Sequence, residues 1–139
     1  MPKRMSISER ESFLSEVQVG IVGIDEKNRS PRIVPLWYSF DPNIGITIIV
    51  KESSKKLKLR KLAMRFSLSV QKATLPCKHV RGQGPIVDVR PCNDQIDLPK
   101  MVYRYLDKIA GAKYLNARPP EKSVVLVMKP EKWITADYT

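Results

Sequence analysis

The most chemically distinctive part of this sequence is a basic stretch that follows an apolar run at residues 46–50. Residues 51–81 contain ten lysines and arginines against a single acidic residue, Glu52. Ser53 or Ser54 is a suitable N-cap for a helix that begins here, so Lys55 and Lys56 fall in its first turn. The ten basic residues are Lys51, Lys55, Lys56, Lys58, Arg60, Lys61, Arg65, Lys72, Lys78 and Arg81.

Lysines in the first turn of a helix destabilise the helix unless an anion binds there. The helix dipole is positive at that end and disfavours each cation by about 0.3–1 kcal/mol. A bound phosphate reverses this effect, because free backbone N–H groups, a serine hydroxyl and two ammonium groups can all donate to it. We therefore predict a phosphate-type site at Ser54, Lys55 and Lys56. A solvated basic face without a ligand is the alternative.

No constellation for acid–base or nucleophilic catalysis accompanies this stretch. His79 is the single histidine, and the sequence contains neither a GxxxxGK[ST] nor a GxGxxG pattern. The two cysteines, Cys77 and Cys92, lack the spacing of zinc ligands, so we expect no metal. A chain of this size in a reducing compartment does not need a disulfide, so we expect two unpaired structural thiols, with a Cys77–Cys92 disulfide as the alternative. An enzyme with this sequence would take its reactive group from a cofactor.

The charge of the chain indicates an anionic partner. There are 25 Lys and Arg against 14 Asp and Glu, a formal net charge of +11. Nucleic acid, an acidic membrane surface and a phosphorylated cofactor would each satisfy this excess. No apolar run approaches the roughly 18 residues of a membrane span, and residues 1–10 have no signal-peptide core. We expect a cytoplasmic protein without a membrane partner.

The first third of the chain combines a short helix with strands. The S-x-x-E pattern from Ser8 to Glu11 predicts a capping box and a helix that ends near Leu14. Strands are predicted from Val17, over residues 32–40 and over residues 46–50, with a turn at residues 41–45. Pro35 removes a backbone donor from the second strand, which predicts an edge strand or a local bend.

In the middle of the chain, the spacing of apolar residues changes from that of a helix to that of strands. Leu59, Leu62 and Phe66, together with Ala63, have the spacing of one helix face, and residues 67–70 return to the strand period. Residues 79–89 predict another strand, bent or bulged where two glycines, Gly82 and Gly84, interrupt it.

A second helix with clear boundary signals follows. Asp97 is its predicted cap, Pro99 lies near its first turn, and Gly111 is its predicted end. Its predicted buried stripe is Val102, Tyr105, Leu106 and Ile109. A last strand is predicted at residues 123–128, before a tail that holds Trp133. Residues 1–139 are thus predicted to form one domain, with a mainly antiparallel sheet that could curl into a barrel.

Several of these segments, in their order and spacing, resemble the pyridoxamine 5'-phosphate oxidase-like split-barrel family. Within it, the sequence is most similar to the single-barrel flavin/deazaflavin oxidoreductases, over about residues 10–137. The segments that carry the resemblance are Phe13-Leu14, residues 32–38, the helix at residues 54–65, residues 68–71, Pro76, Gly84-Pro85, residues 103–106, Tyr114 and residues 130–133.

The resemblance implies a mainly β fold with flanking helices: a six-stranded antiparallel split β-barrel that forms a homodimer with cofactor sites at the interface. It also implies which residues bind the cofactor. Pro35, Leu36, Trp37, Ile49, Val50 and Lys51 would line the ring, Ser54, Lys55, Lys56 and Arg60 would bind the phosphate, and Gln71 would approach the ring. Lys55 stands where arginine is more usual in the family.

The cofactor implied is FMN or the 8-hydroxy-5-deazaflavin coenzyme (F-420). FMN carries one phosphate, whereas the deazaflavin coenzyme carries a phosphodiester and a glutamate tail. The ten basic residues exceed what one phosphate needs, which slightly favours the deazaflavin coenzyme. The chain lacks the Arg-Leu-x-Pro ending of true pyridoxamine phosphate oxidases, so vitamin B6 phosphates are not expected as substrates.

The expected activity is a reductase that transfers a hydride from the reduced cofactor to a small electron-poor molecule, such as an enone, quinone or tetrapyrrole. Solvent and Tyr38 are the candidate proton donors. A cofactor carrier without turnover is one alternative. A basic nucleic-acid-binding module is another, although Phe66 is the single aromatic residue in residues 51–81 and stacking side chains are therefore scarce there.

Overall fold

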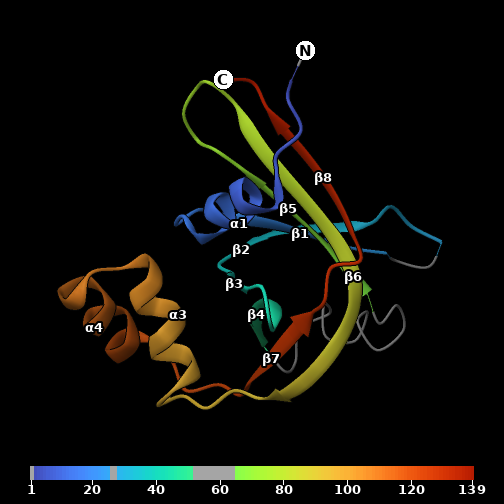
Figure 1. Cartoon of the computed structure of the whole chain (residues 1–139). Helices are drawn as coiled ribbons and strands as arrows, with labels where there is room; N and C mark the ends of the chain where they lie inside the picture. The colour runs from blue at the N-terminus through green and yellow to red at the C-terminus, as the bar shows by residue number, and fades with distance from the viewer. Residues whose placement is uncertain (1, 26–27, 52–64) are drawn as a thin grey trace.

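The computed structural model, which describes residues 2–25, 28–51 and 65–139, is built around a curled antiparallel sheet (Figure 1). Its strands follow the order β2-β1-β5-β6-β7-β4-β3, and β8 also pairs with β6. The strands are β1 Gly20–Ile24, β2 Arg32–Leu36, β3 Ser39–Asp41, β4 Gly45–Lys51, β5 Arg65–Gln71, β6 Lys78–Pro91, β7 Ser123–Met128 and β8 Lys132–Asp137. The described helices are α1 Ile7–Ser15, α3 Asp97–Tyr105 and α4 Lys108–Ala117.

The mainly β architecture with flanking helices is confirmed, but the described residues form eight strands rather than the six predicted. One extra strand arises because residues 32–40 do not form one continuous strand. The chain pairs with β1 up to Leu36, leaves that partner at Trp37 and Tyr38, and then pairs with β4 as β3. The other is β8, where a tail around Trp133 was predicted; it pairs with β6 instead.

The end strand β2 agrees with the prediction made from its proline. β2 stands at one end of the strand order and pairs with β1 alone, with Pro35 opposite Ile21. A proline is tolerated there because an edge strand does not need every backbone donor. The chain also bends immediately after it, at Trp37.

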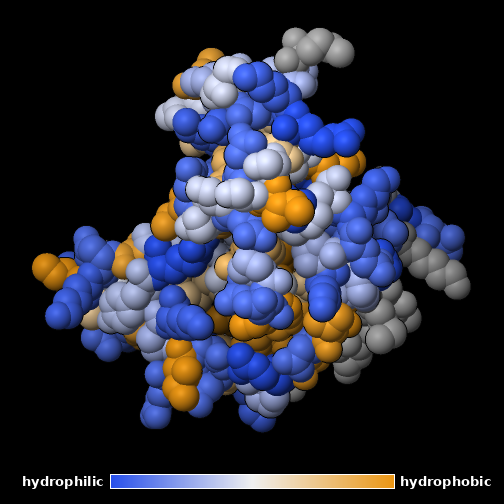
Figure 2. Space-filling model, viewed as in Figure 1, coloured by the Kyte–Doolittle hydropathy of each residue, from blue (hydrophilic) through white to orange (hydrophobic). Residues whose placement is uncertain are grey.

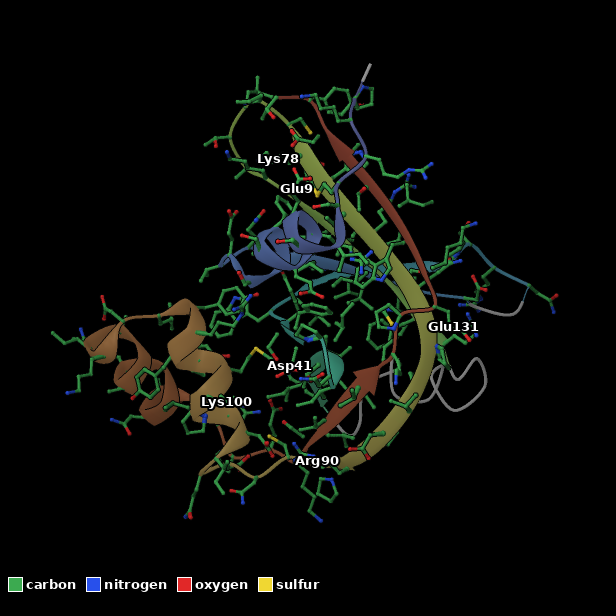
Figure 3. The ribbon with its side chains drawn as sticks, viewed as in Figure 1. Glu9, Asp41, Lys78, Arg90, Lys100 and Glu131 are labelled. Atoms are coloured by element: carbon green, nitrogen blue, oxygen red, sulfur yellow. The ribbon has the colours of Figure 1, made fainter. Side chains whose placement is uncertain are left out.

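β6 is shared by both halves of the barrel. The first part of β6 lies between two strands: it pairs with β5 on one edge, up to Pro85, and with β8 on the other edge, up to Gln83. From Ile86 onward, β6 pairs with β7. Figure 3 shows Lys78 and Arg90 near its two ends, with the strand curving between them. Cys77 and Cys92 flank these ends and are both free thiols.

The bend or bulge in β6 was predicted at Gly82 and Gly84, and this position is wrong. The register with β7 shifts between Ile86 and Asp88 instead. Gly82 makes room for an aromatic ring, since a Cβ there would lie 2.7 Å from the nearest atom of Trp133. The glycines therefore allow close approach of neighbouring segments rather than a bulge.

α1 covers one end of the barrel core. Its Phe13 and Leu14 are buried, and the fully buried Tyr38 donates a hydrogen bond from its hydroxyl to the carbonyl oxygen of Leu14 at 3.0 Å. The capping box is formed by Ser6 and Glu9, not by Ser8 and Glu11, because the helix already begins at Ile7. Its bounds otherwise agree with the prediction.

The helix predicted at residues 54–65 lies outside the described residues, except that Arg65 already belongs to β5. Phe66 was assigned to the apolar face of that helix, which is wrong: it lies in β5 and is buried in the core. The strands predicted at residues 46–50, 67–70 and 123–128 are confirmed as parts of β4, β5 and β7.

The single helix predicted from Asp97 to Gly111 is two helices. The chain leaves the helical conformation after Tyr105, and the side chain of Asp107 then caps α4 by accepting a hydrogen bond from Ala110 N at 2.8 Å. Gly111 therefore lies inside α4, and Ile109 is exposed rather than part of a buried stripe. No helix among the described residues is long and apolar enough to cross a membrane.

The close approach at Gly84 gives a test of this packing. A Cβ on Gly84 would meet the backbone carbonyl of Lys129 and lie 3.0 Å from Glu131 N, so Gly84→Ala must displace the β7–β8 connection. We expect it to lower the free energy of unfolding by about 1–3 kcal/mol, measured by urea denaturation. Gly23→Ala is the matched control, because nothing lies within 4 Å of its Cβ position. Equal stability of the two variants would contradict the packing described.

Candidate functional site

A cavity with a volume of about 470 Å³ lies between the ends of two strands and the α3–α4 pair. Pro35, Leu36 and Trp37 line it from the end of β2 and the bend after it, and Ile49, Val50 and Lys51 line it from the end of β4. We call this the main cavity. Figure 2 shows apolar surface between polar side chains in the region where α3 faces the strands.

The main cavity brings together six of the eleven residues predicted to bind a cofactor. Ser54, Lys55, Lys56 and Arg60 lie outside the described residues. Gln71 does not line the cavity; it ends β5, and its side-chain amide donates to the Cys77 sulfur at 3.7 Å. The binding role of all eleven stays a prediction.

Helix α3 supplies the wall opposite the strands. Leu98, Met101 and Val102 are spaced by three and four residues, lie on one helix face and are buried against the main cavity. Val102 was predicted to belong to a buried stripe, whereas Leu98 and Met101 were not. Their i, i+3, i+4 spacing was the signal available, and the face continues N-terminally to Leu98 rather than C-terminally to Ile109.

The start of α3 is fixed to the end of β6. Asp97 was predicted as the N-cap, but it is the first helical residue, and the N-cap position is occupied by Ile96. The Asp97 carboxylate accepts two hydrogen bonds from Arg90, at 2.6 and 2.9 Å, and one from Asn93 N at 2.8 Å. The Arg90 guanidinium accordingly lowers the pKa of Asp97 below its usual value.

Aromatic rings fix the position of Trp37 at the rim of the cavity. Its indole stacks on Tyr105, with ring centroids 4.8 Å apart and planes 7° from parallel. Tyr114 from α4 approaches the same indole at 5.4 Å with a tilt of 41°. Since Tyr114 also lines the cavity, Trp37 presents a fixed aromatic surface between the strands and α4.

The Tyr105 hydroxyl holds this stack in place. It donates to the carbonyl oxygen of Gln18 at 2.6 Å and accepts from Tyr38 N at 3.1 Å. Tyr38 N has lost its ladder partner because the chain is leaving β2 here. The hydroxyl thus satisfies a backbone group exposed by the bend while it orients Trp37.

Arg104 fastens the end of α3 to the end of α1. Its guanidinium donates to the carbonyl oxygens of Tyr38, Leu14, Ser15 and Glu16 at 2.9 to 3.3 Å. Three of these are carbonyls at the C-terminal end of α1, where a cation is favoured by the helix dipole. The cavity wall is therefore held to the barrel by charge-assisted hydrogen bonds.

One end of the main cavity is charged. Glu121 lies 3.6 Å from the Nζ atom of Lys51 and 3.6 Å from the Nη2 atom of Arg118. Arg118 also donates to the Ser123 hydroxyl at 2.7 Å. Of these four residues, Lys51 alone was predicted at the site, because the position of Ser123 opposite Lys51 follows from the β4–β7 register and not from local sequence. With two cations and one carboxylate, this end carries a net positive charge.

Tyr38, a candidate proton donor, is not placed for that role. Its side chain is buried, its hydroxyl binds the Leu14 carbonyl, and it does not line the main cavity. Burial raises the pKa of this phenol well above its usual value, so it holds its proton firmly. Within the described residues, no group of three or more His, Cys, Asp or Glu side chains is arranged to hold a metal ion.

Comparison with known proteins gives matches at the level of three-dimensional structure. No family model and no curated protein sequence matches the chain. Among solved structures, an F420 reductase superposes with a TM-score of 0.64 and 15% identity, covering 89% of this chain and 94% of the other. A FAD-binding protein from Mesorhizobium loti superposes with a TM-score of 0.65 and 16% identity, covering 100% of this chain and 99% of the other.

A putative pyridoxamine 5'-phosphate oxidase from Listeria innocua also superposes, with a TM-score of 0.64 and 11% identity over 92% of this chain and 95% of the other. All three likenesses extend over nearly the full length of both chains, although few residues are identical. They agree with the arrangement of strands described above. The chain therefore has the split-barrel fold of the pyridoxamine 5'-phosphate oxidase-like proteins.

Proposed function

We propose that this chain binds a flavin or deazaflavin coenzyme in the main cavity and acts as an oxidoreductase. The observation that carries the proposal is the convergence of six predicted ring-binding residues on one cavity. That cavity is closed on its other side by an apolar helix face. When bound, such a coenzyme supplies hydride transfer, a chemistry for which the described side chains have no substitute.

The residues present fit a flat ring with polar edges. The volume of about 470 Å³ lies in the range of small-molecule sites. Leu36 and Val50 offer apolar contacts to ring faces, and Trp37 offers an aromatic one. The free edge of β2 leaves backbone groups available for the polar edge of a ring, because β2 pairs with β1 alone.

A phosphate group would be held beyond Lys51, where the chain continues directly into the segment with Ser54, Lys55 and Lys56. Arg60 was predicted to act with them. The net positive end of the cavity at Lys51, Arg118 and Glu121 supports an anion in this direction. This placement stays a proposal, since residues 52–64 lie outside the described part of the chain.

The α3 wall would hold the electron-poor substrate against the ring. Leu98, Met101 and Val102 exclude water from that side, and the Arg104 and Tyr105 hydrogen bonds keep the wall at a fixed distance from the strands. The proton that completes the reduction would come from solvent, because Tyr38 is buried away from the cavity.

The choice between the two coenzymes is less one-sided than the basic stretch suggested. Five of its ten basic residues are described, and three of these lie near carboxylates. Arg65 pairs with Glu131 at 2.8 Å, Lys78 lies 4.0 Å from Asp137, and Lys51 lies 3.6 Å from Glu121. Less positive charge is therefore free to attract a glutamate tail, and FMN and the deazaflavin coenzyme must be tested side by side.

We also infer a homodimer with the cavity near its interface. β1, β2 and the residue before β1 carry exposed apolar side chains, with Val19, Ile21 and Ile33 at 51%, 38% and 68% exposure. The register of the two strands places Ile21 opposite Pro35 and Ile33 opposite Gly23. Val19 and Pro35 also line the main cavity, so a copy seated on this face would adjoin it.

The nucleic-acid alternative loses further support from the position of Phe66. Stacking of bases needs exposed aromatic rings, and Phe66 is 3% exposed inside the barrel. A carrier that binds the coenzyme without turnover uses the same cavity and is separated from an enzyme by the turnover experiment below.

Ring binding can be tested with the two tryptophans. Trp133→Phe leaves Trp37 as the single tryptophan, and Trp37→Phe leaves Trp133. On titration with FMN or the deazaflavin coenzyme, we expect saturable quenching that is stronger for Trp37, because it lines the main cavity. Equal or stronger quenching of Trp133 would place the ring elsewhere.

The phosphate segment is tested by comparing FMN with riboflavin, which has the same ring without the phosphate. Lys56→Ala should weaken FMN binding about tenfold, since a hydrogen bond to a charged group contributes about 1.5–3 kcal/mol. Riboflavin binding should not change. Lys100→Ala, which removes an exposed lysine outside the cavity, is the control. Equal weakening of both ligands would refute the phosphate assignment.

Turnover separates an enzyme from a carrier. Protein mixed with excess reduced coenzyme and a quinone under anaerobic conditions should oxidise many equivalents of coenzyme, faster than the coenzyme and quinone alone. Met101→Trp narrows the α3 side of the cavity and should lower kcat/KM for the quinone, with coenzyme affinity little changed. Tight coenzyme binding without acceleration over several acceptors would establish a carrier instead.

A further inference from the structure

A second cavity, of about 310 Å³, lies between the N-terminal segment, α1 and β8. It is lined by Arg4, Met5, Arg10, Trp133, Ile134 and Thr135, and shares no residue with the main cavity. We call it the Arg10 cavity. Two of its six lining residues carry a guanidinium, and none carries a carboxylate.

The Arg10 guanidinium is held in one place by the indole beneath it. Its central carbon lies 4.4 Å from the ring centroid of Trp133. That indole is itself fixed, by Phe40 edge-on at 5.9 Å and by Gly82, where a Cβ would collide with the ring. A cation stacked on a fixed ring gives up little conformational entropy when an anion binds.

Arg10 also has unused hydrogen-bonding capacity. Its Nε atom is buried and has no hydrogen-bond partner in the part of the chain that the structure describes. Two other partly buried arginines are well supplied with acceptors: Arg104 donates to four carbonyl oxygens, and Arg118 to Ser123. A buried donor without an acceptor is unfavourable, and it leaves Arg10 with hydrogen-bonding capacity that no described residue uses.

Two carboxylates of the neighbouring segments, those of Glu9 and Asp137, already accept hydrogen bonds from other groups. Glu9, the neighbour of Arg10 in α1, accepts from Ser6 N at 3.0 Å and lies close to Lys78 in Figure 3. Asp137 accepts from the backbone N and the hydroxyl of Thr139, at 2.9 and 2.6 Å. Both carboxylates line a different, neighbouring hollow together with Lys78.

The geometry points to the Arg10 cavity as a second binding site, specific for a phosphate group and independent of the proposed coenzyme site. Arg10 offers a planar fork of donors that matches phosphate oxygens, and Arg4 adds a second positive charge. The Thr135 hydroxyl accepts from Met5 N at 2.9 Å, which leaves its own hydrogen free to donate.

The size of the cavity bears on what carries the phosphate. A volume of about 310 Å³ exceeds that of the bare anion, and Met5 and Ile134 supply apolar surface beside the two arginines. The recognised group is therefore either free inorganic phosphate or the phosphate of a small organic monoester. Both share the chemistry that Arg10 and Arg4 would bind.

The test uses the Trp37→Phe protein, in which Trp133 is the single tryptophan and lies against Arg10. Its emission is followed while inorganic phosphate, and separately ribose 5-phosphate, replaces chloride at constant ionic strength. We expect a saturable change. Arg4→Gln, which keeps the Arg10–Trp133 stack, and Arg10→Gln should each weaken binding about tenfold or more.

Arg29→Gln is the matched control, because it removes the same charge from an exposed position outside the cavity. It should leave the affinity unchanged. Tighter binding of ribose 5-phosphate than of phosphate identifies a monoester site, and equal binding identifies a site for the anion itself. Absence of saturation with both ligands, or affinities unchanged in Arg4→Gln and Arg10→Gln, overturns the proposal.

Discussion

The main cavity depends on one guanidinium group among four carbonyl oxygens. Arg104 joins the end of α3 to the last carbonyls of α1 and to Tyr38, where the chain crosses from one half of the barrel to the other. These carbonyls have no strand or helix partner at those positions. The arginine is the side-chain donor for Ser15 and Glu16, and it adds a second donor at Leu14 and Tyr38, whose carbonyls also accept from tyrosine hydroxyls. In return, α3 is held at the distance from β2 and β4 that leaves a cavity rather than a closed core.

The same crossing explains why aromatic residues gather there. A chain that leaves one sheet partner and joins another exposes backbone groups for two residues, here Trp37 and Tyr38. Tyr38 turns inward and completes the core, whereas Trp37 turns to the cavity and stacks on Tyr105. In Figure 1, α3 and α4 lie together at one side of the barrel. The stack of Tyr105 on Trp37 is one of the contacts that join α3 to the barrel.

Local patterns predicted the strands well and the helices less well. The β-branched run in β4 and the alternation in β5 are properties of a few adjacent residues, so they are visible in the sequence. Phe66 was misassigned because its spacing from Leu62 also suits a helix, and the pairing with Gly84 that fixes it in a strand is distant in sequence. Leu106 and Asp107 divide the predicted helix because Asp107 is a better cap than an interior residue.

The cavity was half predictable for a similar reason. The resemblance to a family predicted the cavity residues on the strands, such as Leu36 and Val50, because they lie in segments that match the family in order and spacing. Arg118, Glu121 and Ser123 were missed because their place beside Lys51 follows from the pairing of β4 with β7, about seventy residues apart in the chain. Such partners follow from topology, and a single sequence does not reveal it.

β2 and β3, the two ends of the strand order, each have a strand partner on one side only, and such edges invite aggregation by adding strands from other molecules. Here both ends of the strand order are poor templates. β3 is three residues long, and β2 carries Pro35, which removes one of the donors that a new strand would need. The net charge of +11 adds repulsion between copies. Growth of the sheet from molecule to molecule is thus disfavoured at both edges, while the faces of the strands remain available for contact through side chains.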